Sequence, residues 1–172
     1  MGLELGPCQV LYGTAGAEVD FGKTEGGVIA HHEILTKELF SDQDGEAPYD
    51  EVITGIKAWV EVPLAEVTLT NIATIFGYTL KHLAGKSGFW GTDLVGTRLR
   101  ALGQSLILKK YVSGVPSTDS DDWLTYPLAS LKGAVELTYD KNTQRVLKAV
   151  FVAFKDDSNH WFLFGTEAAA DS

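Results

Sequence analysis

Two long segments of the chain alternate between apolar and polar positions, as β-strands with one buried face do. Every second residue from Val52 to Leu64 is apolar or threonine, whereas Lys57, Trp59 and Glu61 occupy the other parity. Because successive side chains of a strand point to opposite faces, the segment Glu51–Leu64 is predicted to be a long strand. Pro63 indicates that strand pairing weakens near its end.

The preceding segment, Gly27–Phe40, is a second strand-like run. It begins after Gly26 and ends at the turn-rich stretch Ser41–Pro48, which contains two aspartates, a glycine and a proline. Glycine, aspartate and proline favour turns between strands. The pattern therefore predicts a long hairpin over about residues 27–64, with an acidic tip.

Helical spacing appears only after this hairpin. Apolar residues recur at intervals of three and four between Leu69 and Phe76, Thr68 is suited to cap the N-terminus, and Gly77 to end the helix. This predicts one short helix over about residues 68–76. The glycine-containing segment 77–103 has no sustained period, which predicts a loop or weakly paired strands.

Shorter strands are predicted in the C-terminal half of the chain. Gln104–Val112 is one, and alternation over Leu131–Tyr139 predicts another. A turn at Tyr139–Thr143 then leads into Arg145–Phe154, which makes a second antiparallel hairpin. His160–Phe164 is predicted to be a closing strand.

The remaining segments favour irregular structure. Ser113–Asp122, with Gly114, Pro116 and three aspartates, is predicted to be a mobile loop, and Glu167–Ser172 a frayed tail. No internal repeat of 20 to 50 residues is present. The order of elements predicts a single mainly β domain over residues 1–172, a β-sandwich or barrel with a long hairpin and one short flanking α-helix.

Composition limits the classes of function. The chain has 172 residues, 45% of them hydrophobic, which is typical of a soluble globular domain. A net charge of −9 argues against bulk affinity for nucleic acid or anionic membranes. The single cysteine, Cys8, cannot form an internal disulfide, and the N-terminal sequence has neither the basic nor the apolar region of a secretion signal. We therefore expect folding in the cytosol.

Motifs that would carry catalysis are weak. His31-His32-Glu33 has ligand-type side chains, but adjacent strand residues point to opposite faces, so only His31 and Glu33 would converge. Cys8 has no Cys-x-x-Cys partner and fits a small buried residue better than a nucleophile. Gly85-Lys86-Ser87 lacks the first glycine of a phosphate-binding loop, because Leu80 stands there. We expect no enzyme activity, catalytic residue, cofactor or metal.

Positive and aromatic side chains suggest contacts instead. The local basic group Arg98, Arg100, Lys109 and Lys110 fits a protein partner better than DNA, given the acidic chain. Of the four tryptophans, Trp90 and Trp123 are candidate stacking platforms. The alternative function that follows is a soluble β-barrel that binds a small ligand or a carbohydrate.

Several blocks of sequence, in a characteristic order, resemble one family. The segments Leu5–Val10 and Glu18–Val28 are similar to the start of major tail tube proteins of long-tailed bacteriophages. The later blocks that resemble this family are Asp42–Gln43, Asp50–Gly55, Val62–Glu66, Gly96–Leu108 and Gln144–Phe154. The resemblance covers most of the chain and is weakest at residues 77–90 and 113–122.

The resemblance implies a structural virion protein. Its subunits would form homohexameric rings that stack into the tail tube, which conducts DNA from the capsid to the host. The implied partners are further copies of the chain, the tape measure protein, and the tail-tip and tail-terminator proteins, with assembly in the host cytoplasm and no membrane. DNA would pass without specific binding, since a lumen sharing the negative sign repels phosphates.

The resemblance also assigns roles to the long hairpin. Gly27–Phe40 and Glu51–Leu64 are expected to line the channel and to pair between neighbours, and the helix to pack on the outside. The loop 41–50 is expected to reach an adjacent ring. The residues of this hypothetical ring-stacking loop are Asp42, Gln43, Asp44, Gly45, Glu46 and Asp50.

Overall fold

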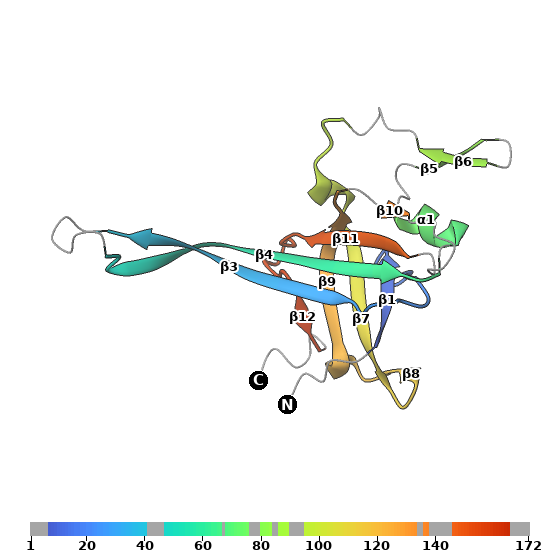
Figure 1. The fold of residues 1–172 in the computed structure, drawn as a ribbon, viewed down its shortest axis with the longest axis horizontal. Coiled ribbons are helices and arrows are strands. Elements are labelled where there is room, and N and C mark those ends of the chain that lie inside the picture. Colours follow the sequence, from blue (N-terminus) through green and yellow to red (C-terminus); the bar gives the residue numbers. More distant parts are fainter. Residues whose placement is uncertain are drawn as a thin grey trace.

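The structure is a computed structural model (Figure 1) that describes residues 7–40, 47–66, 68–75, 80–83, 86–89, 95–133, 136–137 and 146–165. Its strands are β1 (Cys8–Gly13), β2 (Val19–Asp20), β3 (Ile29–Leu39), β4 (Asp50–Leu64), β5 (Leu80–Leu83), β6 (Lys86–Phe89), β7 (Gln104–Val112), β8 (Val115–Pro116), β9 (Trp123–Leu131), β10 (Glu136–Leu137), β11 (Leu147–Ala153) and β12 (Leu163–Phe164). Its helices are α1 (Leu69–Ile75) and the 3₁₀ turns η2 (Leu99–Leu102) and η3 (Ser120–Asp122).

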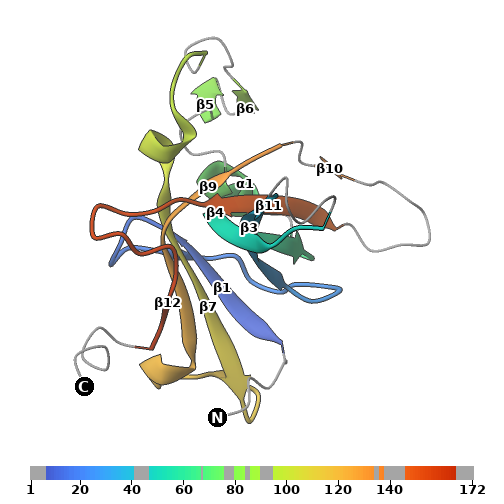
Figure 2. The same cartoon turned by 90° about the vertical axis from the view of Figure 1, so that its left-hand side faces the viewer.

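Most strands belong to one antiparallel sheet that folds over on itself. The strand order is β2-β1-β7-β9-β11-β4-β3, so β2 and β3 are its edges. Figures 1 and 2 show that β3, β4 and β11 form one layer, which crosses the layer of β1, β7 and β9. The prediction of a mainly β fold is therefore confirmed.

The core lies between these two layers and is built on aromatic rings. Tyr12 and Phe151 have ring centroids 4.7 Å apart, and Phe21 lies 5.9 Å from Tyr12. The Tyr12 hydroxyl donates a 3.2 Å hydrogen bond to the carbonyl oxygen of Ala129. This bond satisfies the buried polar atom, so the three rings pack without a polar penalty.

The short helix α1 lies within the segment where the sequence predicts one. The Thr68 hydroxyl accepts a 3.1 Å hydrogen bond from the backbone N–H of Asn71, as expected of an N-cap residue. The Asn71 side-chain amide donates to the carbonyl oxygens of Phe21 and Glu66 at 2.8 and 2.9 Å. These bonds attach the start of the helix to the segments on either side of the long hairpin.

The long hairpin is confirmed over the residues that the structure describes. β3 and β4 pair antiparallel from Ile29↔Glu61 to Leu39↔Asp50. The second hairpin is confirmed at its base, where β10 pairs with β11 at Glu136↔Lys148. The predicted turn at 139–143, the predicted tail at 167–172 and Phe76 of the predicted helix lie outside the described residues.

The strand predicted over Leu131–Tyr139 is interrupted, because Leu131 and Glu136–Leu137 pair with β11 as parts of two separate strands. Leu131 ends β9, a strand that the sequence analysis missed, and Gly133 with φ +89° separates it from β10. Pro127 hid this strand, because proline argues against the middle of a sheet. It is accommodated at an irregularity in which the pairing with β7 skips between Gln104 and Leu106.

Two segments predicted to be irregular contain defined elements. In 113–122, Ser113 and Gly114 have φ +52° and +83° and form a two-residue hairpin turn between β7 and β8. The Asp119 carboxylate accepts from the backbone N–H of Asp121 at 3.0 Å and caps η3. The segment predicted to be a mobile loop therefore holds a hairpin turn and a capped 3₁₀ turn. For residues 77–103 the sequence predicted either a loop or weakly paired strands. The described residues of this segment include a short pair of strands, β5 and β6, and then η2.

Candidate functional site

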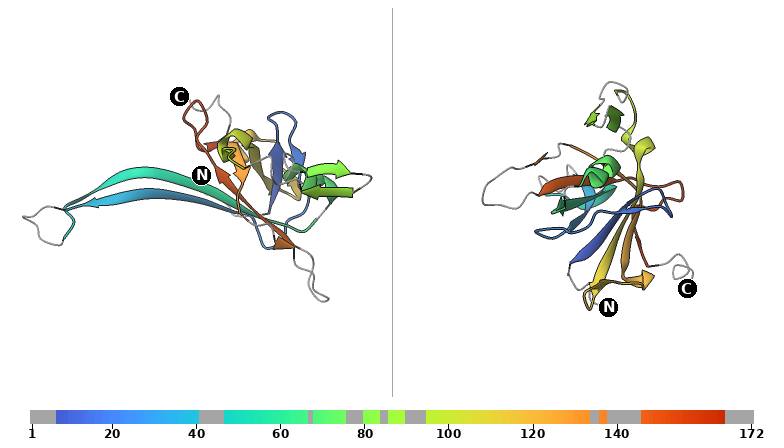
Figure 3. Two further views of the ribbon diagram at one scale, coloured as in Figure 1. Left: turned by 90° about the horizontal axis from the view of Figure 1, so that it is seen from above. Right: turned by 90° about the vertical axis from the view of Figure 1, so that its right-hand side faces the viewer.

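Half of the long hairpin projects from the body of the molecule. β4 pairs with β11 only at Ala58–Leu64, so within the described residues its first half pairs with β3 alone. We call this two-stranded part, residues 34–39 and 50–56, the arm. Figure 1 shows the arm extending away from the two layers, and Figure 3 (left) shows that it curves.

A β-bulge in the arm decides which residues share a face. Leu35 pairs with Gly55 but Thr36 pairs with Ile53, which leaves Thr54 as the extra residue. The Thr54 hydroxyl donates a 3.1 Å hydrogen bond to the carbonyl oxygen of Leu35. The extra residue shifts the alternation of β4, so that Ile53 lies on the same face as Ile34 and Ile56.

This face of the arm continues the face that forms the core. Within the body, Ala58 and Val60 on the same face are each 1% exposed. On the arm, Ile34 is 63% exposed and Ile53 is 65% exposed. The core face therefore extends beyond the body onto the arm, where no described residue covers it.

The described residues at the end of the arm are aromatic and acidic. Phe40 and Tyr49 are 57% and 58% exposed, and the Tyr49 backbone N–H donates to the carbonyl oxygen of Leu39 at 3.0 Å. Asp50, one of the predicted ring-stacking residues, begins β4 and accepts from the backbone N–H of Glu51 at 2.8 Å. The other predicted residues, Asp42, Gln43, Asp44, Gly45 and Glu46, lie outside the described residues.

An apolar groove of about 640 Å³ lies on the opposite face of the β3–β4–β11 layer. Its lining includes Trp59, Val150, Val152 and Trp161, which are all half-buried. Lys132 also lines it, as do Lys57 and Glu33, whose Nζ and Oε2 atoms are 4.0 Å apart. The sequence analysis missed this groove, although it placed Trp59 and Lys57 correctly on the face away from the core.

The two adjacent histidines point to opposite faces, as the strand pattern predicts. On the groove face, His31 stacks on Trp59 at 4.6 Å, and its Nε2 atom is 3.3 Å from Glu61 Oε1. On the core face, His32 Nε2 is 2.9 Å from the Tyr126 hydroxyl. Burial, followed by the charge of His31, lowers the pKa of His32, and burial raises the pKa of Tyr126.

Within the described part of the chain, no group of three or more histidine, cysteine, aspartate or glutamate side chains is arranged to hold a metal ion. The two histidines make aromatic contacts and hydrogen bonds in place of a joint site. Cys8 packs against the core, and burial raises its pKa to about 11. A thiol with so high a pKa is a poor nucleophile at neutral pH.

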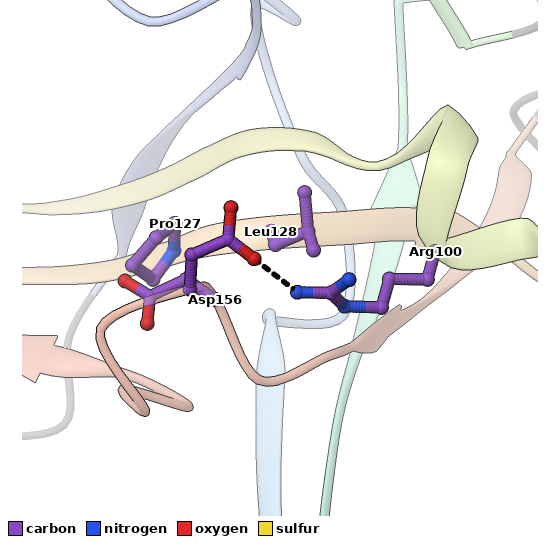
Figure 4. Close-up of a pocket in the computed structure, with 5 residues that line it drawn as sticks. Arg100, Pro127, Leu128 and Asp156 are labelled. Atoms are coloured by element: carbon purple, nitrogen blue, oxygen red, sulfur yellow. Dashed lines mark hydrogen bonds and ion pairs between the residues drawn. The ribbon is translucent and has the colours of Figure 1, made fainter.

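The basic residues that the sequence groups together have separate partners in the fold. The Nη2 atom of Arg100 lies 2.7 Å from Oδ1 of Asp157. Both residues line a pocket of about 230 Å³, together with Pro127 and Leu128 (Figure 4). Lys109 Nζ lies 3.7 Å from the ring centroid of Trp123. Arg100 and Lys109 therefore contact different parts of the fold.

The loop beside that pocket is held by Asp156. Its carboxylate accepts from the backbone N–H groups of Ser158 and His160 at 2.9 and 2.7 Å. Burial raises the pKa of Asp156, but the hydrogen bonds from His160 and Ser158 lower it by more than burial raises it. The pKa of Asp156 therefore lies below its usual value. This arrangement orders the segment that leads to Trp161.

Of the two tryptophans predicted to be stacking platforms, Trp123 lies in the described part of the chain. Trp90 lies outside the described residues. Trp123 carries Lys109 over its ring, and its Nε1–H donates to the carbonyl oxygen of Ser117 at 2.9 Å. Lys109 therefore occupies one face of this ring.

Comparisons with known proteins do not identify the chain: no protein-family model and no curated protein matches its sequence. Across the described residues, no helix is both long enough and apolar enough to cross a membrane.

Proposed function

We propose that the chain is a self-assembling tail tube subunit, whose copies form hexameric rings that stack into the tube of a phage tail. Two lines of support are independent of each other. One is the ordered set of sequence blocks, beginning with Leu5–Val10 and Glu18–Val28, that resembles the major tail tube family. The other is the arm, a structure that a lone subunit does not need.

The observation that carries the proposal is the uncovered arm. A two-stranded ribbon is marginally stable by itself in water, and Ile34 and Ile53 of this one remain more than half exposed. Its edge strand β3 has 11 residues and, in the described part of the chain, pairs only with β4. A long open edge invites pairing with another chain, and a closed ring of copies removes the edges.

The charge of the chain fits a conduit for DNA. Each subunit carries a net charge of −9, so a ring of identical subunits repels phosphates and holds DNA loosely. The tube would be part of the virion, assembled in the host cytoplasm. Its partners would be the tape measure protein, the tail-tip proteins and the tail-terminator proteins.

Deleting residues 42–48 tests the role of the arm tip. We expect the shortened subunit to keep its fold, because the core lies in the body, but to form no stacked tubes in negative-stain electron microscopy. A matched control replaces Ser113 and Gly114, the turn between β7 and β8, by Asn-Gly, which keeps the two-residue hairpin and should leave tubes intact. Normal tubes from the 42–48 deletion would reject the ring-stacking loop.

The alternative function, a soluble β-barrel that binds a small ligand or carbohydrate, predicts a compact monomer. The groove beside Trp59 and Trp161 is the observation that favours it. The exposed apolar face of the arm counts against it, since a monomeric binding protein gains nothing from that face. The mass of the purified protein in solution separates the two functions.

A further inference from the structure

We propose that the arm of one copy binds in the groove of the next copy, with Ile34 and Ile53 packed against Trp59, Val152 and Trp161. This inference rests on the proposed self-assembly and specifies the surfaces that meet. The interface would be heterologous, because each copy contributes an arm to one neighbour and a groove to the other.

A copy cannot fill its own groove. Ile34 and Ile53 share a face with the buried Ala58 and Val60, whereas Trp59 lies on the other face of the same strand. The two faces of one continuous ribbon point in opposite directions. Ile56, at the base of the arm, borders the groove of its own subunit, but Ile34 and Ile53 reach a groove of this kind only on a second molecule.

The two surfaces match in chemistry at their centres. The arm presents Ile34 and Ile53, each with more than half of its surface exposed. The groove presents tryptophan rings and two valines in a hollow of about 640 Å³. Aromatic side chains that line a pocket are typical anchors of protein interfaces, and burying an isoleucine there removes apolar surface from water on both partners.

The charges around the two surfaces are complementary. On the apolar face of the arm, Glu38 lies directly opposite Glu51, an unfavourable pair of like charges, and the one lysine of the arm, Lys37, is on the other face. Among the charged residues that line the groove, Glu33 and Lys57 offset each other at 4.0 Å, and the exposed Lys132 adds a positive charge. Lys148, also exposed, lies on the same face farther along β11. Binding the arm in the groove brings the two carboxylates toward the two ammonium groups.

Such an interface determines the form of the assembly. A head-to-tail contact generates a closed ring if its rotation closes, or an open helical filament if it does not. When two copies share one such contact, the arm of the second copy and the groove of the first remain free to bind further copies, whereas a reciprocal exchange of arms would give a closed dimer. The proposed contact therefore accounts for ring formation without a further site.

Mixing two defective variants tests the contact directly. Ile53→Asp disables the arm and Val152→Asp disables the groove, so each variant alone is expected to be monomeric. Mixed together, they should form a 1:1 dimer and nothing larger, because only one intact arm can meet one intact groove. Sedimentation velocity measures these masses, and circular dichroism checks that each variant is folded.

Charge reversal provides a second test that does not disturb the packing. Glu38→Lys with Glu51→Lys, or Lys132→Glu with Lys148→Glu, should each raise the concentration needed for assembly by about tenfold at low salt. All four substitutions in one chain should restore it. Lys23→Glu with Lys155→Glu provides a matched control outside both surfaces.

The outcomes distinguish this inference from the proposed function. A wild-type chain that stays monomeric at every concentration overturns both. A wild-type chain that assembles, while the Val152→Asp variant assembles equally well, overturns the arm-and-groove contact alone. An apolar small molecule retained in the groove of the purified protein, detected by native mass spectrometry, likewise overturns it.

Discussion

One strand, β4, passes through two different environments. Its second half lies between β3 and β11, and alternate residues such as Val60 and Val62 are 1% exposed. Its first half forms the arm, where Ile53 is 65% exposed although it lies on the same face. The same alternation therefore stabilises the subunit in the body and leaves a surface for a second copy on the arm.

The largest contrast is expected from truncating a core ring. Phe151 is fully buried and contacts the ring of Tyr12. Phe151→Ala should lower the free energy of unfolding by about 3–5 kcal/mol, because it removes apolar contacts and leaves a cavity. Urea denaturation of the monomeric Ile53→Asp background measures this loss without interference from assembly. A loss below about 1 kcal/mol would show that the core is loosely packed.

A smaller loss is expected where β9 meets β3. Tyr126→Phe removes the hydroxyl that lies 2.9 Å from His32 Nε2 but keeps the buried ring. The expected cost is about 1 kcal/mol, the net value of one hydrogen bond. Urea denaturation measures it, and Tyr111→Phe, outside the core cluster, serves as the matched control. An equal loss in both variants would show that the His32 contact has no special weight.

On the arm, truncation should affect association rather than folding. Ile53→Ala is expected to change the free energy of unfolding of the monomer by less than about 0.5 kcal/mol, because the side chain has little cover in one subunit. The same variant should raise the concentration required for assembly. Urea denaturation at high dilution and sedimentation velocity separate the two effects. A stability loss as large as that of Phe151→Ala would mean that the arm packs on its own body.

The smallest effect is expected from acid. Burial, followed by the charge of His31, lowers the pKa of His32 from 6.5, so the folded state favours the neutral imidazole. As the pH falls below 6.5, His32 takes up a proton more readily in the unfolded chain than in the folded one. The free energy of unfolding therefore decreases until the pH reaches the lower pKa of the folded state. Denaturation midpoints between pH 7.5 and 5 measure the slope, and His32→Gln should reduce it. An unchanged slope in that variant would assign the acid response to other groups.

The parity of β4 from Ile56 to Leu64 and the cap of α1 could be predicted from the sequence, because both depend on local spacing, but Val52 lies on the face opposite to the one predicted. The strand β9 could not, since Pro127 argues against a strand until the irregularity opposite Gln104–Leu106 is seen. The bulge at Thr54 gave no sequence signal either. It shifts Ile53 onto the apolar face, whereas simple alternation places Ile53 on the opposite one.

The groove was beyond prediction for a different reason. It forms where β4, β11 and the segment containing Trp161 meet, and these parts are far apart in the sequence. Alternation showed which face Trp59 occupies but not what lies beside it. A contact between distant segments depends on the strand order of the sheet, which single-sequence patterns do not determine.

The claim that the arm requires a second copy is tested most directly by sedimentation velocity of the full chain over a wide range of concentrations. The account predicts that the wild-type protein shifts from monomer to large rings or stacked rings as the concentration rises, whereas Ile53→Asp remains a folded monomer throughout. A wild-type protein that stays monomeric, or an Ile53→Asp variant that assembles like the wild type, would contradict it.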